Sequence, residues 1–195
     1  MILSNVELFA ALDEGRLVIE PEPSPRIPTI NEPDCPFDTH SVDLRLGHQI
    51  SVPKPGQFAY DLTQPGRIAD TIALHCEKIT ITQDQPYMLK PQCFVLGTTL
   101  ERISLPIDRA LKTCLAARIE GKSSRARFGV LVHFTAPTVH PGYDGNLTLE
   151  MINLGPADFI LVPDMRIAQL IVEEVKGIPN QKPSEFQGQS TPPGH

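Results

Sequence analysis

Alternating apolar and polar positions recur along most of the chain, and this pattern predicts strands. "HSVDLRLGHQISV" carries it near the N-terminus, and the preceding "RLVIEP" also indicates a strand. From residue 78 onward, turn residues separate a series of short strand-like runs: "KITITQ", "YMLKP", "CFVLGTTLE", "GVLVHFTA", "NLTLEMIN", "FILVP" and "RIAQLIVEEV". Many short strands at regular spacing are typical of an all-β sandwich or barrel. We therefore predict an all-β fold with minor helices.

Helical signals are few. Ser4 and Glu7 form a capping box at the start of an amphipathic segment that stops at Gly15, which predicts one short helix. "PIDRALKTCLAARIE" (106–120) indicates one more helical turn. The proline-rich residues 21–36 predict an extended surface loop, because proline lacks the N–H group that regular structure uses. No internal repeat or linker divides the chain, so residues 1–195 are predicted to form one domain.

The composition fits a soluble globular protein. A chain of 195 residues, 41% of them hydrophobic, can bury a full core. No apolar run approaches the roughly 20 residues of a membrane span, and the N-terminus lacks the basic flank and cleavage site of a signal peptide. The four cysteines have no paired spacing, which favours unpaired thiols in a reducing compartment over disulfides. We expect a cytoplasmic protein with no membrane partner.

The charge is acidic overall but basic in one stretch. A net charge of −6 argues against nucleic acid as a partner, since no basic field covers the surface. Residues 118–127 nevertheless hold four cations against the single acid Glu120: Arg118, Lys122, Arg125 and Arg127. Gly121, Ser123 and Ser124 lie among them, and a turn of this kind can hold phosphate oxygens with backbone N–H groups and hydroxyls. The two interpretations are an anion-binding turn and a solvated face.

One acid interrupts an otherwise apolar strand. In "NLTLEMIN" the alternation places Leu147, Leu149 and Met151 on one face and Thr148 and Glu150 on the other. Glu150 is then either an exposed strand residue or the carboxylate of a pocket.

The polar tail that follows the last strand, about residues 178–195, has two interpretations. It is either a disordered terminus or a flexible lid that orders over a ligand.

The sequence does not predict a zinc site. His75-Cys76-Glu77 matches the H-x-E half of the zinc-dependent nucleobase deaminase signature, but the P-C-x-x-C half is absent downstream. No other group of His and Cys residues has ligand spacing. We therefore expect no protein-bound metal.

Several ordered motifs resemble the dCTP deaminase branch of the dUTPase-like superfamily. They are "ILSNVELFAALDEGRLVIEP", "SVDLRLG", "GKSSRARFG", "VHFTA", "HPGYDGNLTLEMIN", "PDMRIAQL" and, near the end, "FQGQ". The resemblance implies a distorted β-barrel of the β-clip type that assembles as a homotrimer with shared active sites. It also implies zinc-independent deamination of dCTP to dUTP, which supplies thymidylate synthesis, with Mg²⁺ carried by the triphosphate.

The resemblance assigns roles by position. Glu150 matches the catalytic glutamate, and Ser123 and Arg127 match the Ser and Arg of the S-S-x-A-R motif. Ala136 matches the alanine whose backbone fixes the reacting water. The remaining matches are expected to bind substrate: Lys122, Ser124, Arg125, Ala126, His140, Thr148, Leu149 and Gln189.

Four residues depart from the family pattern. His140 stands where the family has an aspartate, which contacts deoxyribose and, in dUTPases, activates water. Arg125 replaces a leucine beside the phosphate turn. In the tail, Glu185 replaces a lysine and Phe186 a tyrosine, so the lid loses a phosphate contact. Weaker triphosphate affinity is the expected consequence.

Three functions fit the sequence. The first is a dCTP deaminase in which Glu150 acts as both general base and general acid. The second is a dUTP diphosphatase or a bifunctional deaminase-diphosphatase. The third is a catalytically silent nucleotide-binding trimer. The presence of Ser123, Arg127 and Glu150 favours an enzyme.

Overall fold

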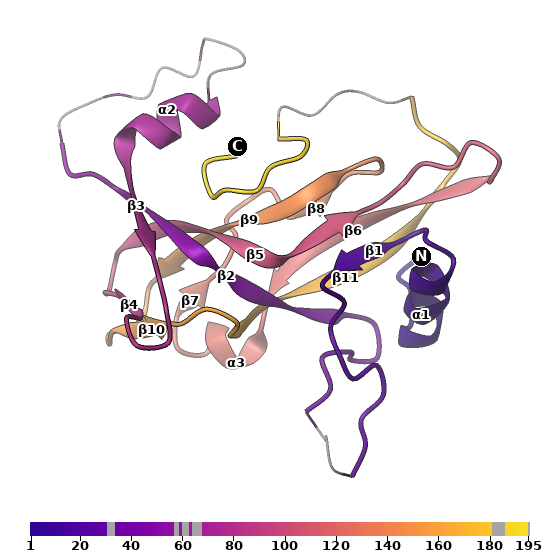
Figure 1. The fold of residues 1–195 in the computed structure, drawn as a ribbon, viewed down its shortest axis with the longest axis horizontal. Helices are drawn as coiled ribbons and strands as arrows, with labels where there is room; N and C mark the ends of the chain where they lie inside the picture. Colours follow the sequence, from indigo (N-terminus) through magenta and orange to yellow (C-terminus); the bar gives the residue numbers. More distant parts are fainter. Residues whose placement is uncertain (31–33, 57–58, 60–62, 64–67, 181–185, 195) are drawn as a thin grey trace.

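The computed structural model describes residues 1–30, 34–56, 59, 63, 68–180 and 186–194 (Figure 1). Within these residues, antiparallel pairing gives the main sheet the order β7-β9-β5-β2-β11-β6-β8, with β1 added on β5 and β3 on β2. Its strands are β1 (Val18–Glu20), β2 (Val42–Pro53), β3 (Cys76–Thr80), β5 (Phe94–Ser104), β6 (Thr113–Gly121), β7 (Val130–Leu131), β8 (Thr138–Val139), β9 (Asp144–Asn153) and β11 (Arg166–Lys176). A separate pair joins β4 (Tyr87–Leu89) to β10 (Phe159–Leu161). The predicted all-β class with minor helices is confirmed.

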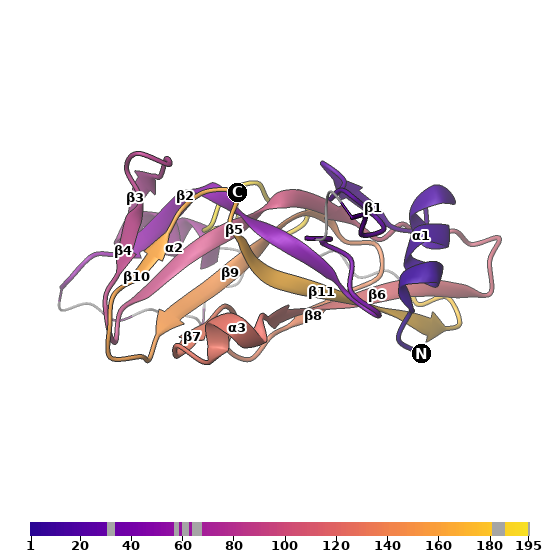
Figure 2. The same ribbon diagram turned by 90° about the horizontal axis from the view of Figure 1, so that it is seen from below.

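The sheet is curled rather than flat, so it forms half of a barrel. Figures 1 and 2 show β2, β5, β9 and β11 crossing the middle of the molecule, with α1 (Asn5–Asp13) at one end and α2 (Ile68–His75) at the other. The inward-facing apolar positions of these strands are fully buried, among them Leu44, Ile50, Leu149, Met151 and Leu170. Their burial is the main force that holds the sheet together.

The predicted N-terminal helix is present as α1. Ser4 caps it, since its Oγ accepts a hydrogen bond from the Glu7 amide at 3.4 Å. Phe9 on this helix packs edge-on against Phe37, with ring centroids 5.1 Å apart. The short helices α2 and α3 (Ser123–Ala126) were not predicted.

The helical turn predicted within 106–120 is wrong. Residues 113–121 form β6, which pairs with β11 from Thr113↔Lys176 to Gly121↔Ala168. The Ala-rich sequence there favours a helix locally, but long-range pairing with an apolar neighbouring strand decides the structure.

The strand predicted for "GVLVHFTA" is also largely wrong. Only Val130–Leu131 form β7, which pairs with the end of β9. Beyond Leu131 the chain leaves the sheet, and the Phe134 amide donates to the Glu150 carboxylate instead of to a neighbouring strand. This hydrogen bond to a side chain replaces the backbone pairing between strands that the apolar pattern predicted.

Within the described residues, no helix is long and apolar enough to span a bilayer. Cys35, Cys76, Cys93 and Cys114 are all free thiols. Burial raises the pKa of the Cys76 and Cys114 thiols, because desolvation disfavours the thiolate.

Candidate active site

Glu150 lies on the outward face of β9, as the alternation predicts. Its neighbours Leu149 and Met151 are fully buried on the core face, whereas Glu150 is half-buried. Its Oε2 accepts a hydrogen bond from the Phe134 amide at 3.0 Å. This bond fixes the carboxylate against residues 132–136, the segment that follows β7.

The basic turn predicted to bind an anion forms α3 and its flanks. The Lys122 carbonyl accepts hydrogen bonds from the Arg125 and Ala126 amides at 2.9 and 3.0 Å, which start the helical turn. Ser123, Ser124, Ala126 and Arg127 are exposed. The side chains of the two serines and of Arg127 form no hydrogen bond or ion pair with the described part of the chain. They are therefore free to bind a ligand.

The side chains of Lys122 and Arg125, the two other cations of the turn, are less accessible to a ligand. Lys122 forms an ion pair with Asp43 on β2, and both side chains are largely buried. Arg125 is half-buried, and its Nε is buried without a hydrogen-bond partner among the described residues.

The turn and the end of β9 lie side by side. In Figures 1 and 2, α3 sits beside β7, next to the tip of β9. The Leu154 amide donates to the Gly129 carbonyl at 2.7 Å. A Cβ atom at Gly155 would lie 2.0 Å from the Phe128 carbonyl oxygen, so only glycine permits this approach. Within one chain, however, neither Ser123 nor Arg127 bonds to Glu150 in the described structure.

The other predicted site residues differ in how far their side chains are exposed to solvent. Ala136 and His140 are exposed in the segment between β7 and β9. Thr148 is half-buried on the same face of β9 as Glu150. Leu149 points into the core, so it could meet a ligand only through its backbone.

The tail residues 186–194 dock against the start of β9. Gln189 is only 6% exposed, and its Nε2 donates to Tyr143 Oη at 3.0 Å and to the Asn146 carbonyl at 2.6 Å. Thr148 Oγ1 donates to the Pro192 carbonyl at 3.4 Å. Figure 1 shows this segment, in yellow, between α2 and β9. Glu185 lies outside the described residues.

Tyr143 is a residue that sequence reasoning missed. Its hydroxyl donates to the Asn146 carbonyl at 2.5 Å and accepts from Gln189. Burial raises its pKa to about 12, because desolvation disfavours the phenolate. The signal was the aromatic in "PGYDG", directly before the strand that carries Glu150.

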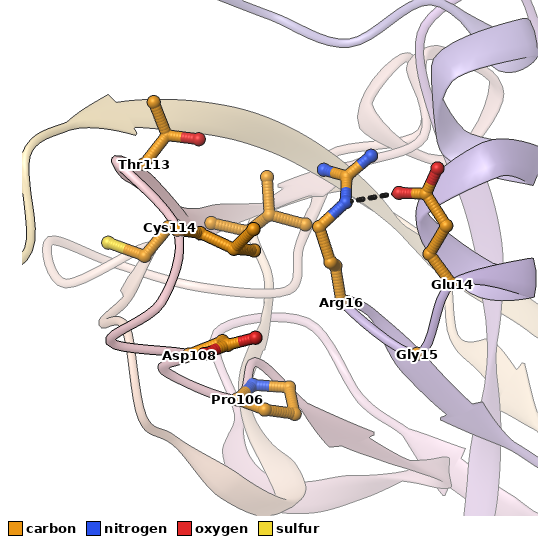
Figure 3. Close-up of a pocket in the computed structure, with 9 residues that line it drawn as sticks. Glu14, Gly15, Arg16, Pro106, Asp108, Thr113 and Cys114 are labelled. Carbon is orange, nitrogen blue, oxygen red and sulfur yellow. Dashed lines mark hydrogen bonds and ion pairs between the residues drawn. The ribbon is translucent and has the colours of Figure 1, made fainter.

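A cavity among the described residues lies elsewhere. A pocket of about 330 Å³ opens between the end of α1, the segment after β5 and the start of β6 (Figure 3). Arg16 points into it and forms an ion pair with Glu14 at 2.6 Å. None of the predicted site residues lines it.

The described residues contain no group of three or more His, Cys, Asp or Glu side chains arranged to hold a metal ion. Mg²⁺ that enters with a triphosphate needs few protein ligands, since it keeps several waters and phosphate oxygens.

Comparison with known proteins identifies the family. Residues 2–175 match the family model described as dCTP deaminase-like. The chain belongs to the dCTP deaminase-like family. This family match includes α3, Glu150 and His140 but ends before Gln189.

Two curated relatives of this dCTP deaminase-like chain are similar over almost its whole length. A dCTP deaminase of Haloarcula marismortui is 38% identical, and the alignment covers 98% of this chain and 92% of the relative. A "dCTP deaminase, dUMP-forming" of Methanosphaera stadtmanae is 35% identical, with 98% and 91% covered.

A solved structure supports the fold. The crystal structure of 2'-deoxycytidine 5'-triphosphate deaminase from Agrobacterium tumefaciens matches with a TM-score of 0.61 at 18% identity. The match covers 89% of this chain and 47% of that protein, so the dCTP deaminase-like chain spans about half the length of the solved one.

Proposed function

We propose that this protein deaminates dCTP to dUTP and ammonia, with Glu150 as general base and general acid. The observation that carries the proposal is the position of Glu150. Its carboxylate stands half-buried on the outward face of β9 and is oriented by the Phe134 amide. Membership of the dCTP deaminase-like family and the names of the curated relatives support cytosine deoxynucleotides as the substrate class.

The chemistry needs one carboxylate that moves two protons. Glu150 takes a proton from a water that adds to C4 of cytosine and passes this proton to N3. It then moves the second proton of that oxygen to the 4-amino group. The C4–N bond breaks, ammonia leaves, and the product has a carbonyl at C4. In this proposal no zinc-bound water is required.

Ser123 and Arg127 orient the water and stabilise the charge that develops on it. Both side chains are exposed, and within the described residues neither forms a hydrogen bond or ion pair, with Glu150 or any other group. We propose that they reach the Glu150 carboxylate of a neighbouring copy in a homotrimer. Ser124 and the backbone at Ala126 and Ala136 complete the substrate contacts, and Mg²⁺ enters on the triphosphate.

Hydrolysis of the triphosphate is the second candidate activity, because the M. stadtmanae relative is named as dUMP-forming. The position that carries aspartate in the family pattern is His140 in this chain, and it is exposed. A carboxylate is anionic at neutral pH and accepts a proton from water. An imidazole differs from a carboxylate in reach and geometry, so it is a poor replacement for that base. We therefore expect dUTP to be the final product.

Product analysis tests both activities. The protein is incubated with Mg²⁺ and each cytosine nucleotide, ammonia is followed, and the nucleotides are separated by ion-exchange chromatography. The expected result is ammonia and dUTP in equal amounts from dCTP, with little pyrophosphate. His140→Asp is the informative variant, since it restores the carboxylate. Stoichiometric pyrophosphate from the wild type would contradict the deaminase-only reaction, and no ammonia from any cytosine nucleotide would contradict the proposed function.

A further inference from the structure

The tail ends in a packed turn, residues 191–194, which lies between α2 and β9 (Figure 1). The Thr191 carbonyl accepts a hydrogen bond from the Gly194 amide at 2.9 Å, and this bond closes the turn. Within the turn, Pro192 and Pro193 are buried. Residues near the end of a chain are usually exposed unless they are attached to the rest of the fold. The C-terminal turn therefore has a docking surface of its own.

One side of this docking surface is the outward face of β9. Thr148 Oγ1 donates to the Pro192 carbonyl at 3.4 Å, so the C-terminal turn lies over Thr148. Thr148 and Glu150 are both half-buried on this face, since every second residue of the strand points outward. The turn is thus placed next to the candidate catalytic carboxylate.

The other side of the docking surface is α2. Ala69 on this helix is only 8% exposed. A Cβ atom on Gly194 would lie 3.5 Å from the Ala69 Cβ and 2.7 Å from Phe186 Cδ1. Gly194 also has a φ of +109°, which residues with a Cβ rarely adopt. A small residue on each side therefore allows α2 and the end of the chain to approach closely.

The helix that receives the turn is itself attached to the sheet. α2 runs directly into β3 at Cys76. The Lys54 amide donates to the His75 carbonyl at 2.8 Å, and Lys54 Nζ donates to the Leu74 carbonyl at 3.1 Å. Because Lys54 follows β2, the last residues of α2 are tied to two neighbouring strands. This attachment gives the C-terminal turn a fixed support opposite β9.

We propose that Ala69 and Gly194 are positioning residues, whose close contact holds the C-terminal turn between α2 and β9. The turn then forms one wall of the substrate site beside Glu150. It is not an inhibitory segment that a nucleotide must displace. The identity of the substrate as dCTP rests on the proposed function. The positioning role rests on the contacts of the turn with α2 and β9.

A wall and an inhibitory segment predict opposite effects of a looser turn. Ala69→Leu adds volume where α2 meets Gly194 and pushes the turn away. If the turn inhibits, its release uncovers Thr148, and the KM for dCTP falls. If the turn is a wall, the KM rises by roughly fivefold, as expected from overpacking one close contact. The kcat should change less, because Glu150 is untouched.

The test compares variants by steady-state kinetics with dCTP. Ala69→Leu and Gly194→Ala should both raise the KM, whereas Ala69→Ser keeps a small side chain and should retain the wild-type value. Ala157→Leu is the matched control, since Ala157 is an exposed alanine between β9 and β10. A KM that falls or stays unchanged in both Ala69→Leu and Gly194→Ala would overturn the inference.

Hydrogen exchange measures the docking of the tail without any substrate. The Gly188 amide is bonded to the Asp144 carbonyl, and the Asn146 amide to the Gln189 carbonyl. Both amides should exchange slowly in the wild type and faster in the two loosened variants. Gly194→Ala leaves α2 and the core intact, so it decides the question even if Ala69→Leu does not fold. Equal exchange in wild type and Gly194→Ala would contradict the positioning role, whether or not dCTP is the substrate.

Discussion

At the scale of single residues, two glutamates of the sheet differ in their partners. Glu101 is fully buried, and its carboxylate is held by the Arg45 guanidinium at 2.7 Å and by the Arg45 amide at 2.8 Å. Both carboxylate oxygens of Glu101 are therefore occupied by charge-assisted or backbone hydrogen bonds from Arg45. Glu150 is held by one neutral N–H group instead. Glu150 is thus oriented but not neutralised, which is the condition a proton-transfer residue needs.

We expect Glu150→Gln to keep nucleotide binding and lose turnover by roughly 10²- to 10⁴-fold, the range typical of general acid–base residues. The amide preserves shape but cannot accept the proton of water. The measurement is kcat for dCTP with nucleotide affinity determined separately. Glu77→Gln is the matched control, since Glu77 is an exposed strand glutamate on β3. Near wild-type deamination by Glu150→Gln would refute the assigned mechanism.

The position of Glu150 could be predicted from the sequence, but the contacts of its neighbours could not. Alternation alone places Glu150 opposite Leu149, because side chains of a strand point to opposite faces in turn. The partner of Lys122 is 79 residues away in the sequence. No local pattern identifies Asp43, since its position depends on how β2, β11 and β6 pair.

At the scale of elements, β9 serves three purposes. Its core face closes the sheet, its outward face carries Thr148 and Glu150, and its first residues hold the tail. The Asn146 amide donates to the Gln189 carbonyl at 2.9 Å, and the Gly188 amide donates to the Asp144 carbonyl at 2.7 Å. The lid predicted from the sequence therefore has an anchor on the strand that carries the candidate catalytic residue. Its closure over a nucleotide stays a prediction.

We expect Gln189→Ala to raise the KM for dCTP by roughly fivefold, the equivalent of about 1 kcal/mol for a lost buried hydrogen bond. The alanine leaves the Asn146 carbonyl with one donor fewer and loosens the tail over β9. Gln187→Ala is the control, since Gln187 is an exposed tail glutamine whose side-chain amide donates to the Gly142 carbonyl at 3.2 Å. Steady-state kinetics and a thermal melt of both variants give the comparison. Equal kinetics for the two would show that the tail has no part in substrate binding.

Long, regular elements were predictable, and short ones that depend on tertiary contacts were not. β9 follows from a period-two pattern along its whole length, and β2 from the same pattern in its first residues. β11 follows from a long strand-like run that is mostly apolar. β6 was missed because its alanines favour a helix until β11 pairs with it. α2 was also missed, although Ile68 and Ile72 recur at helical spacing in its sequence.

At the scale of the whole molecule, the candidate site is open. The serines and Arg127 of the turn project outward, and four apolar side chains near the tip of β9 are exposed: Phe128, Leu131, Phe134 and Leu154. Several exposed large apolar side chains in one region of a protein are typical of an interface. Burial of such a surface by a symmetric copy would also complete the site with a second turn.

We expect the protein to be a homotrimer in solution. Light scattering at micromolar concentration should give a mass three times that of one chain. Phe128→Ser, which removes the largest exposed part of this surface, should shift the population toward monomer and reduce activity in parallel. Leu74→Ser is the control, because Leu74 is equally exposed but lies on α2. A monomeric wild type that retains full activity would contradict both the trimer and the shared site.

The environment of Tyr143 gives the protein an optical property. The chain has three tyrosines and no tryptophan, so tyrosine emission is not lost by energy transfer to an indole. The hydroxyl of Tyr143 bridges Asn146 and the tail glutamine. Phenol emission depends strongly on whether the hydroxyl donates to a carbonyl or to water. The intrinsic ultraviolet fluorescence of the unlabelled protein therefore reports whether the tail is docked on β9.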